Sequence, residues 1–238
     1  LPKLVGNLIG GMLQKPYQEF SNKTTYEVLR SLTNNEELIK VLTAQYGDYG
    51  LPPKQSSFAM HASVVKHYFG GGSFPIGGSS QIVTIDPVIE KSKGTILINA
   101  EVDEIILKKN KATGVKMKDG KCFYAPLIIS GVGVMNTFKK MIPEEHSLYK
   151  EFSSQLTKVK PSVAHGCLYL GLNGTPEELK LPKKNLWIYP DDLDHDGCVD
   201  RFLKDNEQPF PVVYISFPSA KDPDWSNRYP NKSTIDII

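Results

Sequence analysis

Apolar residues recur at helical spacing through the N-terminal part of the chain. Thr24 and Glu27 have the spacing of a capping box, in which each side chain accepts a hydrogen bond from the other residue's main-chain N–H. Apolar residues follow at every third or fourth position, as on one face of a helix. Asn34 or Asn35 can cap a second helix, and a third apolar helix is predicted over residues 57–69. We therefore expect this part of the chain to be helical.

The pattern changes from helix to strand after a glycine-rich stretch at residues 70–78. Ser79 or Ser80 can cap a helix that runs to about Ser92, and Pro87 is expected to kink it. Strands are then expected over residues 95–100, 102–108, 114–117, 122–124 and 127–130. The last of these is apolar throughout, as is typical of a strand buried in a parallel sheet. A turn, a helix and a small antiparallel meander of this kind form one supersecondary unit.

The C-terminal part predicts a short helix at 134–140, a charged segment to residue 160 and a second group of strands. These strands are expected over residues 162–172, 186–189 and 212–217. Asp191 to Asp200 is interpreted as a solvated acidic loop. Residues 235–238 have the pattern of a strand that is cut off partway, and the chain begins with Leu1 rather than Met, so we expect both ends to be truncations. The predicted fold class is mixed α/β.

Composition and charge exclude several classes of partner. The chain has 28 basic and 26 acidic residues, a net charge of +2, and no basic stripe with interleaved aromatic residues, so nucleic acid is not an expected partner. No apolar run approaches the roughly 18 residues that a membrane-spanning helix requires. Three cysteines lie far apart, at Cys122, Cys167 and Cys198, which favours neither a metal site nor a disulfide.

The histidines do not form a metal-binding pattern. His61 and His67 are six residues apart, so they do not share a helix face as paired zinc ligands would. We interpret His61 as a structural histidine, with a place in a ligand pocket as the alternative. His195 lies among aspartates but fits no calcium-loop pattern. No metal site is therefore predicted, and no nucleophile elbow or catalytic triad is present.

Three ordered motifs carry a resemblance to a known family. They are GDYGLPP at residues 47–53, FAMHA at residues 58–62 and FPIGGSS at residues 74–80. The strand with Val102 and Ile105, and segments 125–130 and 162–172, continue the pattern in the same order. Together they resemble the carotenoid isomerase and phytoene desaturase group of FAD-dependent oxidoreductases, and within it the retinol-saturating branch.

The resemblance implies a fragment of a two-domain flavoprotein. Residues 1–68 and 143–238 would belong to a substrate or cap domain, and residues 69–142 to the FAD-binding domain. The group's GxGxxG fingerprint is not found, because the glycines at residues 6–11 lack its spacing, so we expect the pyrophosphate contacts and the N-terminal Rossmann βαβ unit outside this chain.

The activity implied is FAD-dependent saturation of one carbon–carbon double bond in a retinol-type polyene, with NAD, NADP or another reductant recharging the flavin. The implied substrate is a retinoid or carotenoid-like lipid. The implied location is the endoplasmic reticulum membrane, reached through segments outside this chain. Two alternatives stay open: a carotenoid isomerase or desaturase of the same group, and a non-catalytic lipid-binding protein. No catalytic residue can be named.

The resemblance also implies cofactor contacts. Gly77 and Gly78 would let main chain approach the flavin, although a plain tight turn explains the same glycines. Main-chain groups of Val102, next to Glu101, would bind the adenine. Ser130 follows an apolar strand at the end where ligands bind in open α/β sheets, with a plain turn as the alternative. We expect the Gly77 turn and the Val102 main chain to face one groove.

Several aromatic residues suit either the wall of a long apolar pocket or an ordinary core. They are Trp187, Tyr189, Phe210 and Tyr214. An apolar wall could bind a polyene through burial alone, at about 0.8 kcal/mol for each buried methylene.

Overall fold

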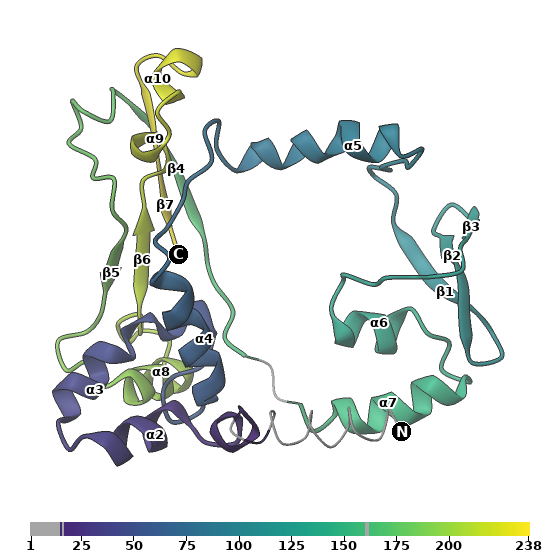
Figure 1. The fold of residues 1–238 in the computed structure, drawn as a ribbon, viewed down its shortest axis with the longest axis horizontal. Coiled ribbons are helices and arrows are strands. Elements are labelled where there is room, and N and C mark those ends of the chain that lie inside the picture. The colour runs from purple at the N-terminus through teal and green to yellow at the C-terminus, as the bar shows by residue number, and fades with distance from the viewer. Residues whose placement is uncertain (1–14, 16, 160–161) are drawn as a thin grey trace. The chain divides into compact units, whose positions relative to one another are not determined.

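The structure is a computed structural model that describes residue 15, residues 17–159 and residues 162–238 (Figure 1). The chain forms two compact units. The first unit combines residues 1–82 with residues 162–238, and the second unit consists of residues 83–161. Helices and antiparallel sheets occur together, which confirms the expected mixed α/β class. These units do not test the expected division into substrate and FAD domains, which stays a prediction.

The first unit contains one four-stranded sheet and a group of short helices. Its helices are α2 (Thr25–Leu32), α3 (Glu36–Leu42), η1 (Ala44–Asp48), α4 (Phe58–Tyr68), α8 (His195–Lys204), α9 (Pro218–Lys221) and α10 (Trp225–Arg228). Its strands are β4 (Leu168–Asn173), β5 (Leu186–Ile188), β6 (Val213–Ser216) and β7 (Lys232–Ile237). The 3-10 helix η2 (Ser79–Ile85) begins in this unit and ends in the next. The glycines at residues 6–11 lie outside the described residues.

The second unit contains a three-stranded sheet and three helices. Its elements are α5 (Asp86–Lys91), β1 (Val102–Lys108), β2 (Lys111–Met117), β3 (Cys122–Tyr124), α6 (Val134–Lys140) and α7 (Ser147–Leu156). The strands pair antiparallel in the order β1-β2-β3, so the expected meander is confirmed. The register shifts between Val102 and Glu104, which places a bulge at Asp103.

The helix start predicted at Thr24 is confirmed in full. The Thr24 hydroxyl accepts the Glu27 N–H at 3.1 Å, and the Glu27 carboxylate accepts the Thr24 N–H at 2.7 Å. The main-chain N–H and the hydroxyl of Thr24 both donate to the Glu27 carboxylate, and together they hold the pKa of Glu27 below its ordinary value. Asn35, one of the two expected caps, starts α3 by accepting the Leu38 N–H at 3.0 Å. Local side chains therefore define where these helices begin.

The four-stranded sheet depends on its last strand along the chain. All pairs are antiparallel and the order is β4-β7-β6-β5, so β7 lies between β4 and β6 (Figure 1). The partial strand expected at residues 235–238 is therefore an inner strand, paired along Leu168 to Asn173 on one side. The strand expected over residues 162–172 begins only at Leu168, where β7 starts to provide partners.

Two of the predicted strands are wrong within the described structure. Residues 95–100 and 127–130 form no strand, and Ile98 and Ile129 are 83% and 85% exposed. An apolar run becomes a strand only where another strand supplies a hydrogen-bond ladder. Neither run pairs with a strand among the residues that the structure describes.

Two local predictions also need correction. The helix expected from Ser79 to Ser92 is the 3-10 helix η2 followed by α5, and Pro87 lies in the first turn of α5. Proline is tolerated there because its missing N–H would have no partner within the helix. The expected acidic loop is instead the start of α8, where the Asp194 carboxylate accepts the Gly197 N–H at 3.2 Å. Aspartate favours this position because it caps the first turn of a helix.

Within the described ranges, no helix is both long and apolar enough to cross a membrane.

The capping box generates a stability prediction. Replacing Thr24 with alanine should lower the free energy of unfolding by about 1 kcal/mol, because an N–H at the start of α2 loses its acceptor. Urea unfolding followed by circular dichroism measures the change. Thr24→Ser is the matched control, since it keeps the hydroxyl and should stay within about 0.5 kcal/mol of the parent. Equal losses in both variants would contradict the role of the hydroxyl.

Candidate functional site

Gly77 and Gly78 form a turn that requires glycine for its backbone conformation alone. Their φ angles are +92° and +78°, in the region that L side chains rarely adopt. The Gly78 N–H closes the turn by donating to the Pro75 carbonyl at 2.9 Å. A side chain on Gly77 would collide with the side chain of Gln81, whereas Gly78 has open space where its Cβ would be. The need for a tight turn is therefore sufficient to explain both glycines. Only Gly78 leaves room for another group to approach the main chain closely.

A buried carboxylate holds this turn in place. The Gly77 N–H donates to both carboxylate oxygens of Asp222, at 3.1 and 3.2 Å. The same carboxylate accepts the Asp224 N–H at 3.0 Å and pairs with the Arg228 guanidinium. Asp222 is only 5% exposed, so its charge depends on these donors. The Asp222 interaction therefore ties the turn to the segment that contains α9 and α10.

The surroundings of Asp222 favour its charged form. Burial by itself raises the pKa of the carboxyl. The two main-chain N–H donors and the Arg228 guanidinium outweigh this effect and hold the pKa of Asp222 below its ordinary value. Folding therefore stabilises the carboxylate rather than the acid.

Asp222 was not among the residues singled out from the sequence. It lies 145 residues from Gly77, and an aspartate followed by Pro223 is typical of many surface turns. The one sequence feature that points to Asp222 is its spacing from Asp224 and Arg228 on a short polar segment. This spacing indicates a local ion pair, but it does not indicate that Asp222 also binds the distant Gly77.

In the second unit, Val102 presents main-chain groups at a sheet edge. The Lys118 N–H donates to the Glu101 carbonyl at 3.0 Å, next to the pair formed by Val102 and Met117. Val102 therefore occupies a non-hydrogen-bonded position, so its own N–H and C=O point away from β2. Since β1 is an edge strand, they face outward, and neither has a partner elsewhere in the described ranges.

Other contacts limit how much of this edge is open. The Ile105 N–H already donates to the Met141 carbonyl at 2.8 Å. The Glu101 side chain forms an exposed ion pair with Lys118 at 2.6 Å. The open part of the edge is therefore the main chain at Val102, while both the carbonyl and the carboxylate of Glu101 are engaged within the sheet.

Ser130 lies on a small hollow at the start of α6. The Thr137 hydroxyl donates to the Gly133 carbonyl at 2.8 Å, so the 2.7 Å contact between the two hydroxyls requires Ser130 to be the donor. The hollow measures about 500 Å³ and is lined by Ser130, Gly131, Gly133, Val134, Thr137 and Phe138. Gly131 and Gly133 have open space at their Cβ positions. Ser130 is therefore accessible from a glycine-lined surface.

The predicted site residues belong to different units. Gly77 and Gly78 lie in the first unit, whereas Glu101, Val102 and Ser130 lie in the second. That the Gly77 turn and Val102 face one groove therefore stays a prediction, as do the cofactor roles of all five residues.

The histidines are structural in their contacts. His61 is buried beside Tyr49, whose hydroxyl lies 3.1 Å from its Nδ1, and burial lowers the pKa of the ring. His195 is buried as well, and its Nε2 donates to the Lys40 carbonyl at 2.8 Å. Burial lowers its pKa too, although the Lys40 carbonyl acts in the opposite direction. Across the described ranges, no three histidine, cysteine or acidic side chains are grouped as metal ligands.

The aromatic residues proposed for a pocket wall are half-buried, except for Phe210, which is exposed. Trp187 packs edge-on against Tyr214 with ring centroids 4.9 Å apart, and Tyr189 packs against His195 at 5.2 Å. Phe210 is exposed and contacts only the ring of Phe202, at 5.3 Å, among the aromatic contacts described. These first three residues are half-buried, so their ring contacts leave both the pocket-wall and the core explanation open.

Comparison with curated proteins supports the resemblance inferred from the motifs. The chain is 36% identical over 233 residues to human all-trans-retinol 13,14-reductase and 32% identical to the zebrafish protein of that name. The human alignment covers 94% of this chain but 38% of the relative, so the chain spans well under half the length of these proteins. A prolycopene isomerase of an Oncidium hybrid cultivar is 25% identical over 91% of the chain. The predicted resemblance is thus confirmed.

One solved structure shows the same fold. An oxidoreductase from Methanosarcina mazei superposes with a TM-score of 0.57 at 16% identity, covering 91% of this chain and 47% of that protein. No protein-family model matches the chain. The fold is therefore that of part of a larger oxidoreductase structure.

The Asp222 interaction generates a pH-dependent prediction. Asp222→Asn should lower the free energy of unfolding at pH 7 by about 1–3 kcal/mol, because the buried group that pairs with Arg228 and accepts the Gly77 N–H loses its charge. Since the native pKa of Asp222 is lowered, its stabilisation is present above the unfolded value of about 3.9 and is lost as the pH falls through the native value. The difference between parent and variant should therefore shrink below about pH 4, as measured by urea unfolding across pH.

Asp224→Asn is the matched control for this experiment. Asp224 pairs with the same arginine at 3.3 Å but is 40% exposed, so its loss should cost about 0.5 kcal/mol or less. A pH-independent effect of Asp222→Asn, or an equal effect of the control, would contradict the role given to the buried carboxylate.

Proposed function

We propose that the protein is an FAD-dependent oxidoreductase that saturates one carbon–carbon double bond of a retinol-type polyene, converting all-trans-retinol to 13,14-dihydroretinol. The single observation that carries this proposal is the 32–36% identity to all-trans-retinol 13,14-reductases over more than nine-tenths of the chain. Because the chain spans only 38% of those relatives, the activity is proposed for the whole protein of which these residues form a part.

The described residues fit a role in holding FAD, which supplies the hydride chemistry when bound. Val102 offers an outward-facing N–H and C=O at a strand edge, a pair of groups that matches the donor and acceptor pattern of an adenine ring. Ser130 lies on a glycine-lined hollow that leaves room for a nucleotide. These residues would bind and orient the cofactor.

Gly77 and Gly78 would not bind the cofactor through free main-chain N–H groups, as the glycines of an anion-binding turn do. Both of their N–H groups already donate within the protein, to Asp222 and to Pro75. They therefore have no amide to offer to the flavin, and Gly78 would contribute through its missing side chain alone. Asp222 would keep this surface in position.

Substrate binding would rest mainly on apolar contacts. A retinoid is a long apolar molecule with one polar end, and burial of its skeleton at about 0.8 kcal/mol for each methylene supplies affinity without many hydrogen bonds. The choice between NAD and NADP as reductant, and a location at the endoplasmic reticulum membrane, remain predictions from the resemblance.

Two observations favour alternative functions for the protein. The prolycopene isomerase similarity favours a cis/trans isomerase of carotenoids acting with the same kind of cofactor. A zebrafish relative named as an inactive all-trans-retinol 13,14-reductase is 32% identical to the chain, the same identity as the zebrafish reductase. A non-catalytic lipid-binding protein therefore stays a distinct alternative.

A product assay discriminates among these functions. The protein, produced with all the sequence that its gene encodes and loaded with FAD, should convert all-trans-retinol to a product heavier by two hydrogen atoms, detected by liquid chromatography and mass spectrometry. Isomerisation of a carotenoid without any gain in mass would favour the isomerase. Binding of retinol with neither reaction would favour the non-catalytic protein.

The cofactor role of Val102 has its own test. Val102→Pro removes the outward N–H at an edge position, where proline is tolerated, and should weaken FAD binding about tenfold. Val102→Ala keeps the N–H and should bind FAD as the parent does. Flavin titration followed by fluorescence gives both dissociation constants. Parent-like binding by the proline variant would exclude the main-chain contact.

A further inference from the structure

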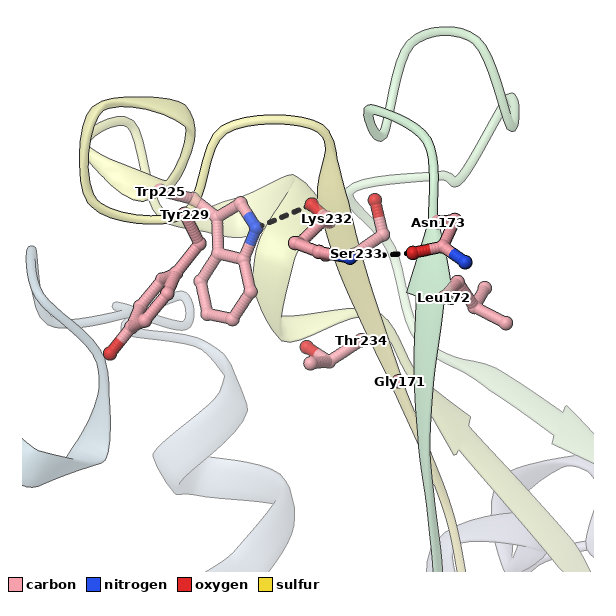
Figure 2. Close-up of a pocket in the computed structure, with 8 residues that line it drawn as sticks. All are labelled: Gly171, Leu172, Asn173, Trp225, Tyr229, Lys232, Ser233 and Thr234. Carbon is pink, nitrogen blue, oxygen red and sulfur yellow. Dashed lines mark hydrogen bonds between the residues drawn. The ribbon is translucent and has the colours of Figure 1, made fainter.

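A second hollow lies in the first unit, between α10 and the strands β4 and β7 (Figure 2). Its volume is about 420 Å³, within the range of about 300–1,000 Å³ typical of small-molecule sites. It is lined by Gly171, Leu172, Asn173, Trp225, Tyr229, Lys232, Ser233 and Thr234.

One wall of the hollow is a pair of fixed aromatic rings. The Trp225 and Tyr229 centroids are 4.7 Å apart, and the indole N–H donates to the Lys232 carbonyl at 2.7 Å (Figure 2). The Arg228 guanidinium lies 5.1 Å from the Tyr229 centroid and is itself held by the Asp222 carboxylate. Because the rings are anchored before any ligand arrives, little side-chain entropy would be lost on binding.

The strand beside the rings is open at Gly171. This glycine lies within β4, where glycine weakens a strand, and its φ is not in the left-handed region. No atom lies within 4 Å of where its Cβ would be. A strand glycine of this kind is typical of a place where another group approaches closely, and here the open space belongs to the hollow.

Lys232 supplies the cationic hydrogen-bond donor among the residues that line the hollow. Lys232 Nζ donates to the Asn173 side-chain oxygen at 2.6 Å, which uses one of its three N–H groups (Figure 2). No carboxylate of a described residue lies within ion-pair distance of Lys232. Lys232 is an exposed residue that lines the hollow, and its ammonium has no opposite charge to pair with among the described residues.

We propose that this hollow binds an amphiphilic carboxylic acid, with the carboxylate on Lys232 and the apolar body against Trp225. A carboxylate accepts charge-assisted hydrogen bonds from the ammonium, which are about twice as strong as those made by a neutral hydroxyl. The aromatic wall and the open strand at Gly171 accept a chain of methylene groups. The site therefore selects an acid over the alcohol of the same length.

The test compares decanoate with decanol on the protein produced with all the sequence that its gene encodes. Trp187→Phe leaves Trp225 as the only tryptophan of these 238 residues, and quenching of its fluorescence reports occupation of the hollow. If tryptophans occur in flanking sequence, they are replaced by phenylalanine as well. Decanoate should bind about tenfold more tightly than decanol.

Variants of Lys232 decide between this site and non-specific uptake. Lys232→Met should abolish the preference for the acid, and Lys232→Arg should retain it. Lys184→Met removes an exposed lysine outside the hollow and should change nothing. Equal affinity for acid and alcohol, an equal effect of Lys184→Met, or quenching only where the ligand forms micelles would each overturn the proposal. Unchanged thermal unfolding of each variant shows that it remains folded.

Discussion

The pairing of Asp222 with its three donors is the constraint on which much of the first unit depends. A buried carboxylate is costly unless hydrogen bonds and an opposite charge compensate it, and here it has two main-chain N–H groups and the Arg228 guanidinium. The carboxylate in turn fixes the positions of the groups that donate to it. It holds the Gly77 turn on one side, and on the other it orients the arginine beside the aromatic rings of α10. Two candidate binding features thus share one electrostatic anchor.

The same dependence on distant partners explains the sheets. β7 pairs with β4 on one side and with β6 on the other, so the last described strand completes a sheet whose other members lie earlier in the chain. Residues 95–100 and 127–130 have equally apolar sequences but form no strand, and isoleucines in both are exposed. The paired strands β4, β6 and β7 differ from residues 95–100 and 127–130 in having a hydrogen-bonding partner, not in the composition of the segment.

The candidate site uses main chain more than side chains. At Val102 the useful groups are an N–H and a C=O at a strand edge, and at Gly78 the useful feature is an absent side chain. Such features leave no chemical signature in the residue type, so the resemblance to a flavoprotein family indicates them and the composition does not.

The sequence by itself determined what depends on near neighbours: the capping box at Thr24, the cap at Asn35, the meander of residues 102–124 and the family resemblance of the ordered motifs. These rest on side chains that meet their partners within a few positions, so their spacing is sufficient to identify them. Only the tertiary structure decided the partner of Gly77, the absence of a strand at residues 127–130 and the uncompensated charge of Lys232. Each of those depends on atoms far apart along the chain, and a local pattern carries no information about which distant group will supply the hydrogen bond or the charge.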